Sequence, residues 1–474
     1  MTADAASTLV LYGITGDLAH KMVLPALYAL EARGELPVSV VGVARGVGEP
    51  NALLTRQRDT MQTESADFDA AAFDRLAAKT TLVDGDYNDP ATFTRLADQV
   101  DRNGFLVHYL AVPPGLFATV ANGLATAGLA ENARLVVEKP FGHDRDSARQ
   151  LNRQLQRVFP EQRLFRVDHY LGKEAVEDLL VLRFANALFE PLWNRTHIAS
   201  VQITLAEAFD VASRGAFYDA VGAIRDVVQN HLLQVLALLA MDPPVDQSAD
   251  ALRDEKVRLL KAVRTPTAAD MVRGRYTGYL DTTGVAPGSR TETFAALRLY
   301  IDNWRWADVP FVIRSGKALA ATTLEVIAEL RQPPQMLFCP SDAARPEPNF
   351  VRLPLQPRMR LSFDLLAKSP GAGYRTAPIR ATADLDRRLG TGPAAYERVL
   401  ADALAGDPHE FAREDMVEQA WRVVDPLLDR RDDPIDYPRG SWGPTEADRL
   451  TLAGRWYPLQ HTSDGRDQHG KEPS

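Results

Sequence analysis

Short apolar runs alternate with stretches of helical period over roughly the first 170 residues. The runs are Leu9–Tyr12, Val38–Ala44, Phe105–Ala111, Arg134–Val137 and Leu164–Val167, and the helical stretches are Lys21–Arg33, Pro114–Leu129 and Asp144–Phe159. Continuous apolar runs are typical of strands covered by helices on both faces, and strand–helix alternation predicts a parallel sheet. We therefore expect an α/β domain over residues 1–175, with ligands bound beyond the carboxyl ends of its strands.

The pattern changes after about residue 175, where strand-like runs follow one another without regular helices between them. These runs are Val201–Ala206, Phe294–Tyr300, Phe311–Arg314, Leu324–Arg331, Phe350–Leu355 and Met359–Leu365. This pattern predicts a larger α+β domain over residues 176–460, built on a mostly antiparallel sheet. Gly, Pro and small residues predict a loop from Lys368 to Ala381. The polar residues 461–474 are expected to be a disordered tail.

Composition and charge narrow the possible partners. The chain has 474 residues, 45% hydrophobic and 25% charged, with a formal net charge of −9. This balance argues against a nucleic-acid or anionic-membrane partner. The single cysteine, Cys339, excludes an intrachain disulfide and a cysteine metal cluster. Because no apolar run approaches the roughly 18 residues of a membrane span and the N-terminus lacks the basic region of a signal peptide, we expect a cytoplasmic protein.

The first apolar run leads into a glycine-rich turn that precedes a helical stretch. A turn of this kind at a helix N-terminus lets backbone N–H groups approach a pyrophosphate. The spacing is GxxGxxA rather than GxGxxG, so a tight turn without a ligand stays open as an alternative. Its position inside a strand–helix unit favours a Rossmann-type dinucleotide-binding domain. The candidate cofactor residues are Gly13, Thr15, Gly16, Asp17 and Leu18.

Arg45 follows the second strand, at the point where such domains contact the adenosine ribose. An acidic residue there selects NAD, whereas an arginine suits the 2′-phosphate of NADP. No acidic residue follows Arg45 before Glu49, which favours NADP. A solvated arginine is the alternative, and Gly46 offers no side chain to sharpen the selectivity.

Three polar segments stand where the pattern places strand ends or the start of a buried helix. They are Val136–Gly142 (VVEKPFG), Arg166–Glu174 (RVDHYLGKE) and Gly222–Gln234 (GAIRDVVQNHLLQ). Polar groups entering a buried helix cost free energy unless they have partners. A functional cleft would explain them, and so would a satisfied structural network.

With these segments in view, the sequence resembles glucose-6-phosphate dehydrogenases along nearly its whole length. The matching stretches are GITGDLA, VVEKPFG, RVDHYLGKE, LRFAN, WNR, GAIRDVVQNHLLQ, IRSGKAL and GPTEAD. The resemblance implies NADP-dependent oxidation of glucose 6-phosphate to its lactone, without a metal. It also implies a small-molecule sugar phosphate as the substrate and a homodimer or homotetramer assembled through the sheet of the second domain.

The resemblance also assigns roles to residues of this chain. His231 matches the general base that removes the proton of the sugar's C1 hydroxyl, and Asp168 matches the carboxylate that orients this imidazole. Such a pair is chemically reasonable, because imidazole titrates near neutral pH and a carboxylate stabilises its charged form. Phosphate binding falls to His169, Tyr170 and Lys173, sugar and cofactor contact to Lys139, and further sugar contacts to Glu207, Asp226, Lys317 and Gln356.

Two positions depart from the family pattern. Met22 and Thr322 stand where the family usually has basic residues. A charge-assisted hydrogen bond contributes about 1.5–3 kcal/mol, so its loss would weaken substrate binding roughly 10- to 100-fold. Two alternatives therefore stay open: the same chemistry on a different sugar phosphate, and a catalytically weak regulatory paralogue.

Overall fold

The computed structural model describes residues 5–46, 50–64, 67–333, 348–371, 373, 375–429 and 432–460. These residues form two compact units. Unit 1 comprises residues 1–177, 241–258 and 392–421, and unit 2 comprises residues 178–240, 259–391 and 422–474. Unit 1 therefore contains two later segments in addition to the N-terminal domain expected from the sequence. The predicted tail, 461–474, lies outside the described residues.

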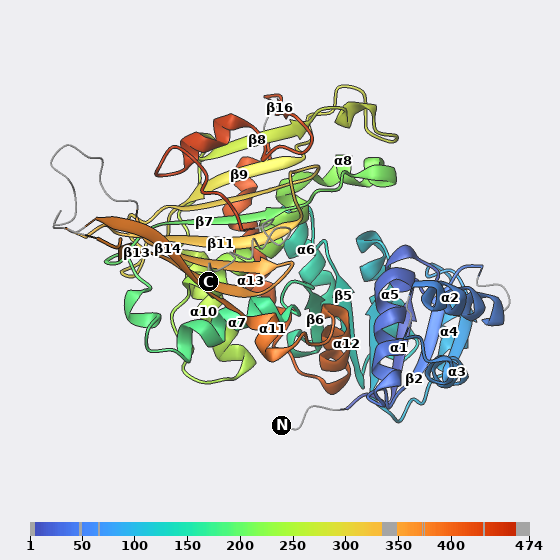
Figure 1. The fold of residues 1–474 in the computed structure, drawn as a ribbon. Coiled ribbons are helices and arrows are strands. Elements are labelled where there is room, and N and C mark those ends of the chain that lie inside the picture. The colour runs from blue at the N-terminus through green and yellow to red at the C-terminus, as the bar shows by residue number, and fades with distance from the viewer. Residues whose placement is uncertain are drawn as a thin grey trace. The chain divides into compact units, whose positions relative to one another are not determined.

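Unit 1 is built on a seven-stranded sheet in the order β15-β6-β5-β4-β1-β2-β3 (Figure 1). All neighbouring strands are parallel except β15, which pairs antiparallel with β6. The order confirms a Rossmann-type sheet. Its strands are β1 Thr8–Tyr12, β2 Ser39–Ala44, β3 Thr80–Asp84, β4 Leu106–Leu110, β5 Ala133–Glu138, β6 Leu164–Val167 and β15 Phe411–Ala412.

Helices cover this sheet or connect the two units along the chain. They include π-helix η1 Ala19–Val23, α1 Leu24–Ala32, α2 Pro50–Glu64, α3 Ala70–Ala78, α4 Pro90–Ala97, α5 Phe117–Thr126, α6 Arg145–Gln156, α7 Glu174–Phe184, α10 Ala249–Ala262, α12 Ala395–Ala405 and α13 Glu414–Val424. The predicted helix Lys21–Arg33 is thus a π-turn followed by α1. None of the described helices is long and apolar enough to cross a membrane.

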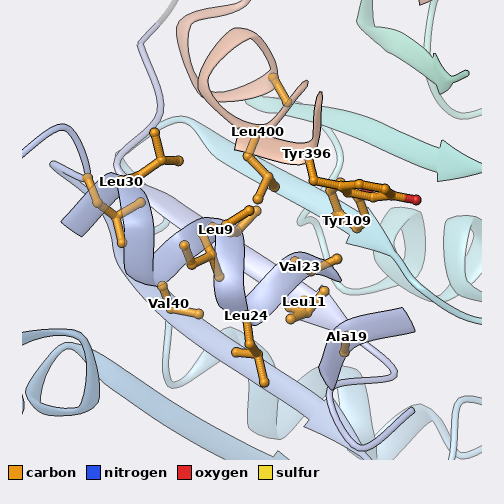
Figure 2. Close-up of a cluster of buried hydrophobic side chains, with 14 of the residues drawn as sticks. Leu9, Leu11, Ala19, Val23, Leu24, Leu30, Val40, Tyr109, Tyr396 and Leu400 are labelled. Atoms are coloured by element: carbon orange, nitrogen blue, oxygen red, sulfur yellow. The ribbon is translucent and has the colours of Figure 1, made fainter. Parts of the chain in front are cut away.

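The core of unit 1 joins segments from both ends of the sequence (Figure 2). Leu9 of β1, Tyr109 of β4 and Leu400 of α12 are fully buried in one hydrophobic cluster. Helix α12 contributes side chains at helical spacing: Tyr396, Val399, Leu400 and Ala403. Antiparallel pairing of Phe411 with Val167 fixes the same C-terminal segment beside β6.

Unit 2 contains a nine-stranded sheet in the order β14-β13-β12-β11-β7-β10-β9-β8-β16 (Figure 1). The pairs β10–β7 and β16–β8 are parallel and the others antiparallel, which confirms the mostly antiparallel sheet. Its strands are β7 Ile198–Ala206, β8 Met271–Tyr276, β9 Phe294–Leu299, β10 Phe311–Gly316, β11 Thr323–Leu330, β12 Phe350–Gln356, β13 Arg360–Lys368, β14 Thr376–Asp384 and β16 Ile435–Tyr437. Its helices include α8 Gly215–Ala223, π-helix η6 Ile224–Leu232, α9 Leu233–Ala240 and α11 Leu385–Leu389.

Five strands were not predicted from the sequence, namely β3, β8, β14, β15 and β16, and two of them, β3 and β14, share one reason. The loop predicted from Lys368 to Ala381 is wrong at its end, because Thr376–Asp384 forms β14, an edge strand whose side chains are mostly exposed. β3 is an edge strand of the other sheet, the one in unit 1, and only one of its five residues is buried. Edge strands with little buried surface carry no continuous apolar run, so the hydrophobic pattern does not mark them.

Candidate active site

The glycine-rich turn lies between β1 and the π-helix η1, at the carboxyl edge of the unit 1 sheet. Gly13 has φ +80°, and a Cβ there would lie 2.3 Å from the carbonyl oxygen of Ala111 at the end of β4. The N–H of His20 donates to the carbonyl of Gly16 at 3.0 Å, so the helix begins just after Gly16. The N–H groups of a helix's first turn lack partners within the helix. The turn therefore has the donors and dipole that suit the pyrophosphate of NADP.

Arg45 lies at the end of β2, with 74% of its side chain exposed, as expected for a ribose-contacting position. The structure corrects the inference that no acid stands near it. Asp86, in the loop after β3, places Oδ2 3.4 Å from Nη1 of Arg45. Asp84 accepts a hydrogen bond from the backbone N–H of Gly46 at 2.7 Å. Asp86 stands 41 positions after Arg45, and only the pairing of β3 with β2 brings it near, a strand that the hydrophobic pattern does not predict.

Lys139 and Asp168 follow neighbouring strands of the unit 1 sheet. β5 and β6 are parallel, and Glu138 pairs in register with Val167, so the two candidate residues leave the same edge side by side. Asp168 is 3% exposed. Its Oδ1 accepts a hydrogen bond from the N–H of Tyr170 at 3.1 Å, which closes a tight turn after β6.

This turn gathers the predicted phosphate-binding residues. The Nζ atom of Lys173 lies 3.5 Å from the ring centroid of Tyr170. The ring of His169 lies 5.0 Å from Tyr170 and stacks on Tyr396 of α12 at 6.0 Å and 21°. Gly172 lets the turn lie against α12, because a Cβ there would meet the carbonyl of Ala395 at 2.9 Å. One cation, one imidazole and one phenol thus share a single turn, a donor set that suits a phosphate.

Unit 2 gathers a second group of predicted residues at the ends of two parallel strands. Ala206 of β7 pairs with Gly316 of β10, which places Glu207 beside Lys317. The ammonium of Lys317 forms an ion pair with Glu207 and lies 3.4 Å from Oδ2 of Asp226. The three side chains are 10–19% exposed. A cation between two partly accessible carboxylates offers a donor group and two acceptor groups to sugar hydroxyls.

His231 and Asp226 belong to one nine-residue π-helix, η6, in unit 2. π-Helical segments are rare and frequently occur at functional sites. His231 is 3% exposed, and its backbone N–H donates to Oδ1 of Asn230 at 2.7 Å. The helix begins against Glu292, whose Oε1 accepts from the N–H of Ile224 at 3.0 Å. Burial raises the pKa of Glu292 above its ordinary value.

The remaining positions lie on or near these elements. Gln356 ends β12, and its register through Leu324 to Leu205 places it at the same edge of the sheet as Glu207. Thr322 accepts a hydrogen bond from the N–H of Ala208 at 3.0 Å, so its hydroxyl orders the segment after β7. In unit 1, Met22 is 40% exposed on η1.

The predicted residues therefore form two groups, each within one compact unit. Unit 1 holds the cofactor residues with Lys139, Asp168, His169, Tyr170 and Lys173, and unit 2 holds Glu207, Asp226, His231, Lys317 and Gln356. The pairing of Asp168 with His231 stays a prediction.

Three residues next to these groups were not predicted from the sequence, because only the folded structure brings them there. Tyr396 stacks on His169 although the two stand 227 positions apart, and Glu292 begins η6 from a loop before β9. No local pattern marks either one. Asp86 could have been found from the run Leu82-Val83-Asp84-Gly85-Asp86, an apolar pair followed by a turn with two acids.

Two family models match the chain. The model described as the NAD binding domain of glucose-6-phosphate dehydrogenase matches residues 10–178, and the model of its C-terminal domain matches residues 180–457. The chain belongs to the glucose-6-phosphate dehydrogenase family. The matches confirm the resemblance inferred from the motifs.

Individual relatives cover nearly the whole chain. Glucose-6-phosphate 1-dehydrogenase 1 of Mycobacterium tuberculosis is 45% identical over 465 residues, which is 98% of each chain. The enzyme of Treponema pallidum is 39% identical and covers 95% of this chain and 94% of its own.

Solved structures agree with this assignment. The glucose-6-phosphate 1-dehydrogenase of Mycobacterium avium superposes with a TM-score of 0.90 at 44% identity, covering 97% of this chain and all of its own. A glucose-6-phosphate dehydrogenase in complex with its substrate, glucose 6-phosphate, superposes at 0.88 with 32% identity and the same coverage.

Proposed function

We propose that this chain oxidises glucose 6-phosphate at C1 to 6-phosphogluconolactone, the first oxidative step of the pentose phosphate pathway, with NADP as the hydride acceptor. The observation that carries the proposal is helix η6. It presents an imidazole, His231, five residues after Asp226, which contacts the Lys317 ammonium. A candidate base and a candidate sugar-binding group thus share one helix, which sets their spacing, and acid–base catalysis depends on such fixed positioning.

The chain's residues take the following roles in this proposal. His231 accepts the proton of the C1 hydroxyl, and Asp168 orients the imidazole and stabilises its charged form. Glu207, Asp226, Lys317 and Gln356 bind the sugar, and His169, Tyr170 and Lys173 bind its phosphate. Lys139 contacts both sugar and cofactor. NADP supplies the hydride acceptor when it binds at the turn formed by Gly13, Thr15, Gly16, Asp17 and Leu18, with Arg45 at the 2′-phosphate.

We further propose that the protein is cytoplasmic and forms a homodimer or homotetramer through the sheet of unit 2. The edge strand β14 and its neighbour β13 support this surface. Leu365 of β13 pairs with Ile379 of β14, so both side chains lie on one face of the sheet, and they are 38% and 48% exposed.

Replacement of the proposed base tests the reaction. We expect His231→Asn to lower kcat by two to four orders of magnitude, because general base catalysis contributes about that much. The KM for glucose 6-phosphate should change little, since the imidazole acts mainly on the transition state. Reduction of NADP followed by absorbance gives both constants.

A matched control is His197→Asn, which changes an exposed histidine of the same unit and should leave kcat intact. Full activity of His231→Asn would contradict the assigned base. Turnover on galactose 6-phosphate, glucosamine 6-phosphate or free glucose above that on glucose 6-phosphate would contradict the proposed substrate.

A further inference from the structure

The loop after β3 contacts both turns that would hold the adenosine half of a dinucleotide. The hydroxyl of Tyr87 accepts a hydrogen bond from the N–H of Gly13 at 2.9 Å and donates to the carbonyl of Val43 at 2.9 Å. Asp84, the last residue of β3, accepts a hydrogen bond from the N–H of Gly46 at 2.7 Å. The end of β3 and the loop after it therefore fix the glycine-rich turn and the end of β2 relative to each other.

Within this loop, Asp86 is held in place and faces Arg45. Its Oδ1 accepts from the backbone N–H of Asn88 at 2.9 Å and from the Asn88 side chain at 3.0 Å. Its other oxygen, Oδ2, is the atom 3.4 Å from Nη1 of Arg45. The hydrogen bonds from Asn88, and secondarily Arg45, hold the pKa of Asp86 below its ordinary value. The carboxylate is therefore charged at neutral pH and oriented toward the guanidinium.

This arrangement combines two features that usually exclude each other. An arginine at the end of the second strand binds a 2′-phosphate, whereas a carboxylate near the ribose accepts a hydrogen bond from the 2′-hydroxyl of NAD and repels a phosphate. Arg45 provides the arginine and Asp86 the carboxylate, and the two residues follow neighbouring parallel strands, β2 and β3.

We propose that Asp86 is a specificity-determining residue that opposes Arg45, so that the site binds NAD as well as NADP rather than NADP alone. The inference rests on the proposed function, in which Arg45 binds the 2′-phosphate. To reach Arg45, a 2′-phosphate must displace Asp86 or bind beside its negative charge. A 2′-hydroxyl meets no such repulsion.

The test removes the charge of Asp86 and keeps its turn. Asp86→Asn retains an oxygen that accepts the hydrogen bond from Asn88, so the loop is conserved. Calorimetric titration with adenosine 2′,5′-bisphosphate and with ADP measures binding without turnover. We expect the variant to bind the 2′,5′-bisphosphate about five- to tenfold more tightly, as one charge removed near a phosphate predicts, and ADP within about twofold of the original chain.

Salt and a matched variant separate this electrostatic role from a structural one. The increase in affinity for the 2′,5′-bisphosphate should shrink as ionic strength rises, because exposed charges are screened. An increase caused by a changed loop structure would persist at high salt. Asp98→Asn makes the same charge change at the far end of helix α4, where Asp98 is the C-cap, and should alter neither affinity.

Steady-state kinetics with both cofactors complete the experiment. In Asp86→Asn the ratio of kcat/KM for NADP to that for NAD should rise by the same factor. An unchanged ratio together with unchanged binding would overturn the role of Asp86. Arg45→Ala tests the underlying assignment separately. If Arg45→Ala binds the 2′,5′-bisphosphate as tightly as the original chain, the proposed role of Arg45 fails. If Arg45→Ala binds it more weakly but Asp86→Asn binds it no more tightly, only the further inference is refuted.

Discussion

Glu138 is a buried carboxyl group at the end of β5, between the cofactor half and the phosphate-binding turn of unit 1. Tyr109 donates a hydrogen bond to its Oε1 at 2.5 Å, and the side chain is 6% exposed. Burial raises the pKa of Glu138 to about 7. This pKa is lowered in part by hydrogen bonds from Tyr109 and Tyr396 and by the charge of Lys139. The carboxylate of Asp168 raises it. Glu138 thus changes charge in the pH range where the protein would work.

This pKa predicts a pH-dependent stability. Between about pH 4.5 and pH 7 the folded chain keeps the proton that the unfolded chain has lost, so the contribution of Glu138 to stability falls as pH rises through this window. A pKa rise of this size corresponds to roughly 3–4 kcal/mol. We expect Glu138→Gln, which cannot ionise, to gain stability relative to the original chain between pH 5 and pH 8. Urea unfolding at each of the two pH values measures the free energy of unfolding of both proteins. The same difference between variant and original chain at both pH values would contradict the prediction.

At the scale of elements, the π-helix η6 depends on a carboxylate from another part of unit 2. The chain enters the helix through Gly222, with φ +71°, where a Cβ would lie 2.6 Å from Oε1 of Glu292. Glu292 then accepts the N–H of Ile224, and its own carbonyl accepts the N–H of Ala223. Glu292 therefore fixes the first turn of the helix, and the positions of Asp226 and His231 depend on that turn.

The contact predicts the effect of two substitutions. Glu292→Ala leaves the buried N–H of Ile224 without its acceptor, which should cost about 1–3 kcal/mol of stability. Because η6 positions Asp226, the KM for glucose 6-phosphate should rise severalfold as well. Glu292→Gln retains an acceptor oxygen and should recover most of both properties. Thermal unfolding and steady-state kinetics measure the two effects, and equal losses in both variants would show that the charge matters rather than the cap.

For the whole molecule, the compact units do not coincide with continuous stretches of chain. Residues 392–421 belong to unit 1, although they follow most of unit 2 in the sequence. The N–H of Ala6 donates to the carbonyl of Leu404, and the ring of Phe411 lies 4.4 Å from that of Phe165. The stability of the cofactor unit therefore depends on residues near the end of the chain.

This dependence predicts that a core substitution in α12 destabilises the cofactor unit. Leu400→Ala creates a cavity in the core of unit 1 and should cost about 2–5 kcal/mol. Leu389→Ala makes the same change at a side chain that is 79% exposed and should cost little. In calorimetry, the unfolding transition of the cofactor unit is the one whose temperature rises when NADP is added. Leu400→Ala should lower the temperature of that transition, and an unchanged temperature would contradict the placement of α12 in unit 1.

Local pattern determined a large part of the protein: every parallel strand of unit 1 except β3, most strands of unit 2, and the family. Buried strands carry continuous apolar runs, and the motifs RVDHYLGKE and GAIRDVVQNHLLQ are specific in their order of residues. The edge strands β3 and β14 lack such runs because they bury little.

Tertiary structure alone decided which distant groups meet. Asp86 faces Arg45, Tyr396 stacks on His169, and Glu292 begins the helix of His231. Each of these contacts joins segments that only the sheet order or the packing of α12 brings together. A one-dimensional pattern reports the burial of a residue and not the identity of its neighbour, so the contacts of Tyr396 and Glu292 could not be predicted from the sequence. Asp86 would have required β3 to be recognised first from its short apolar pair.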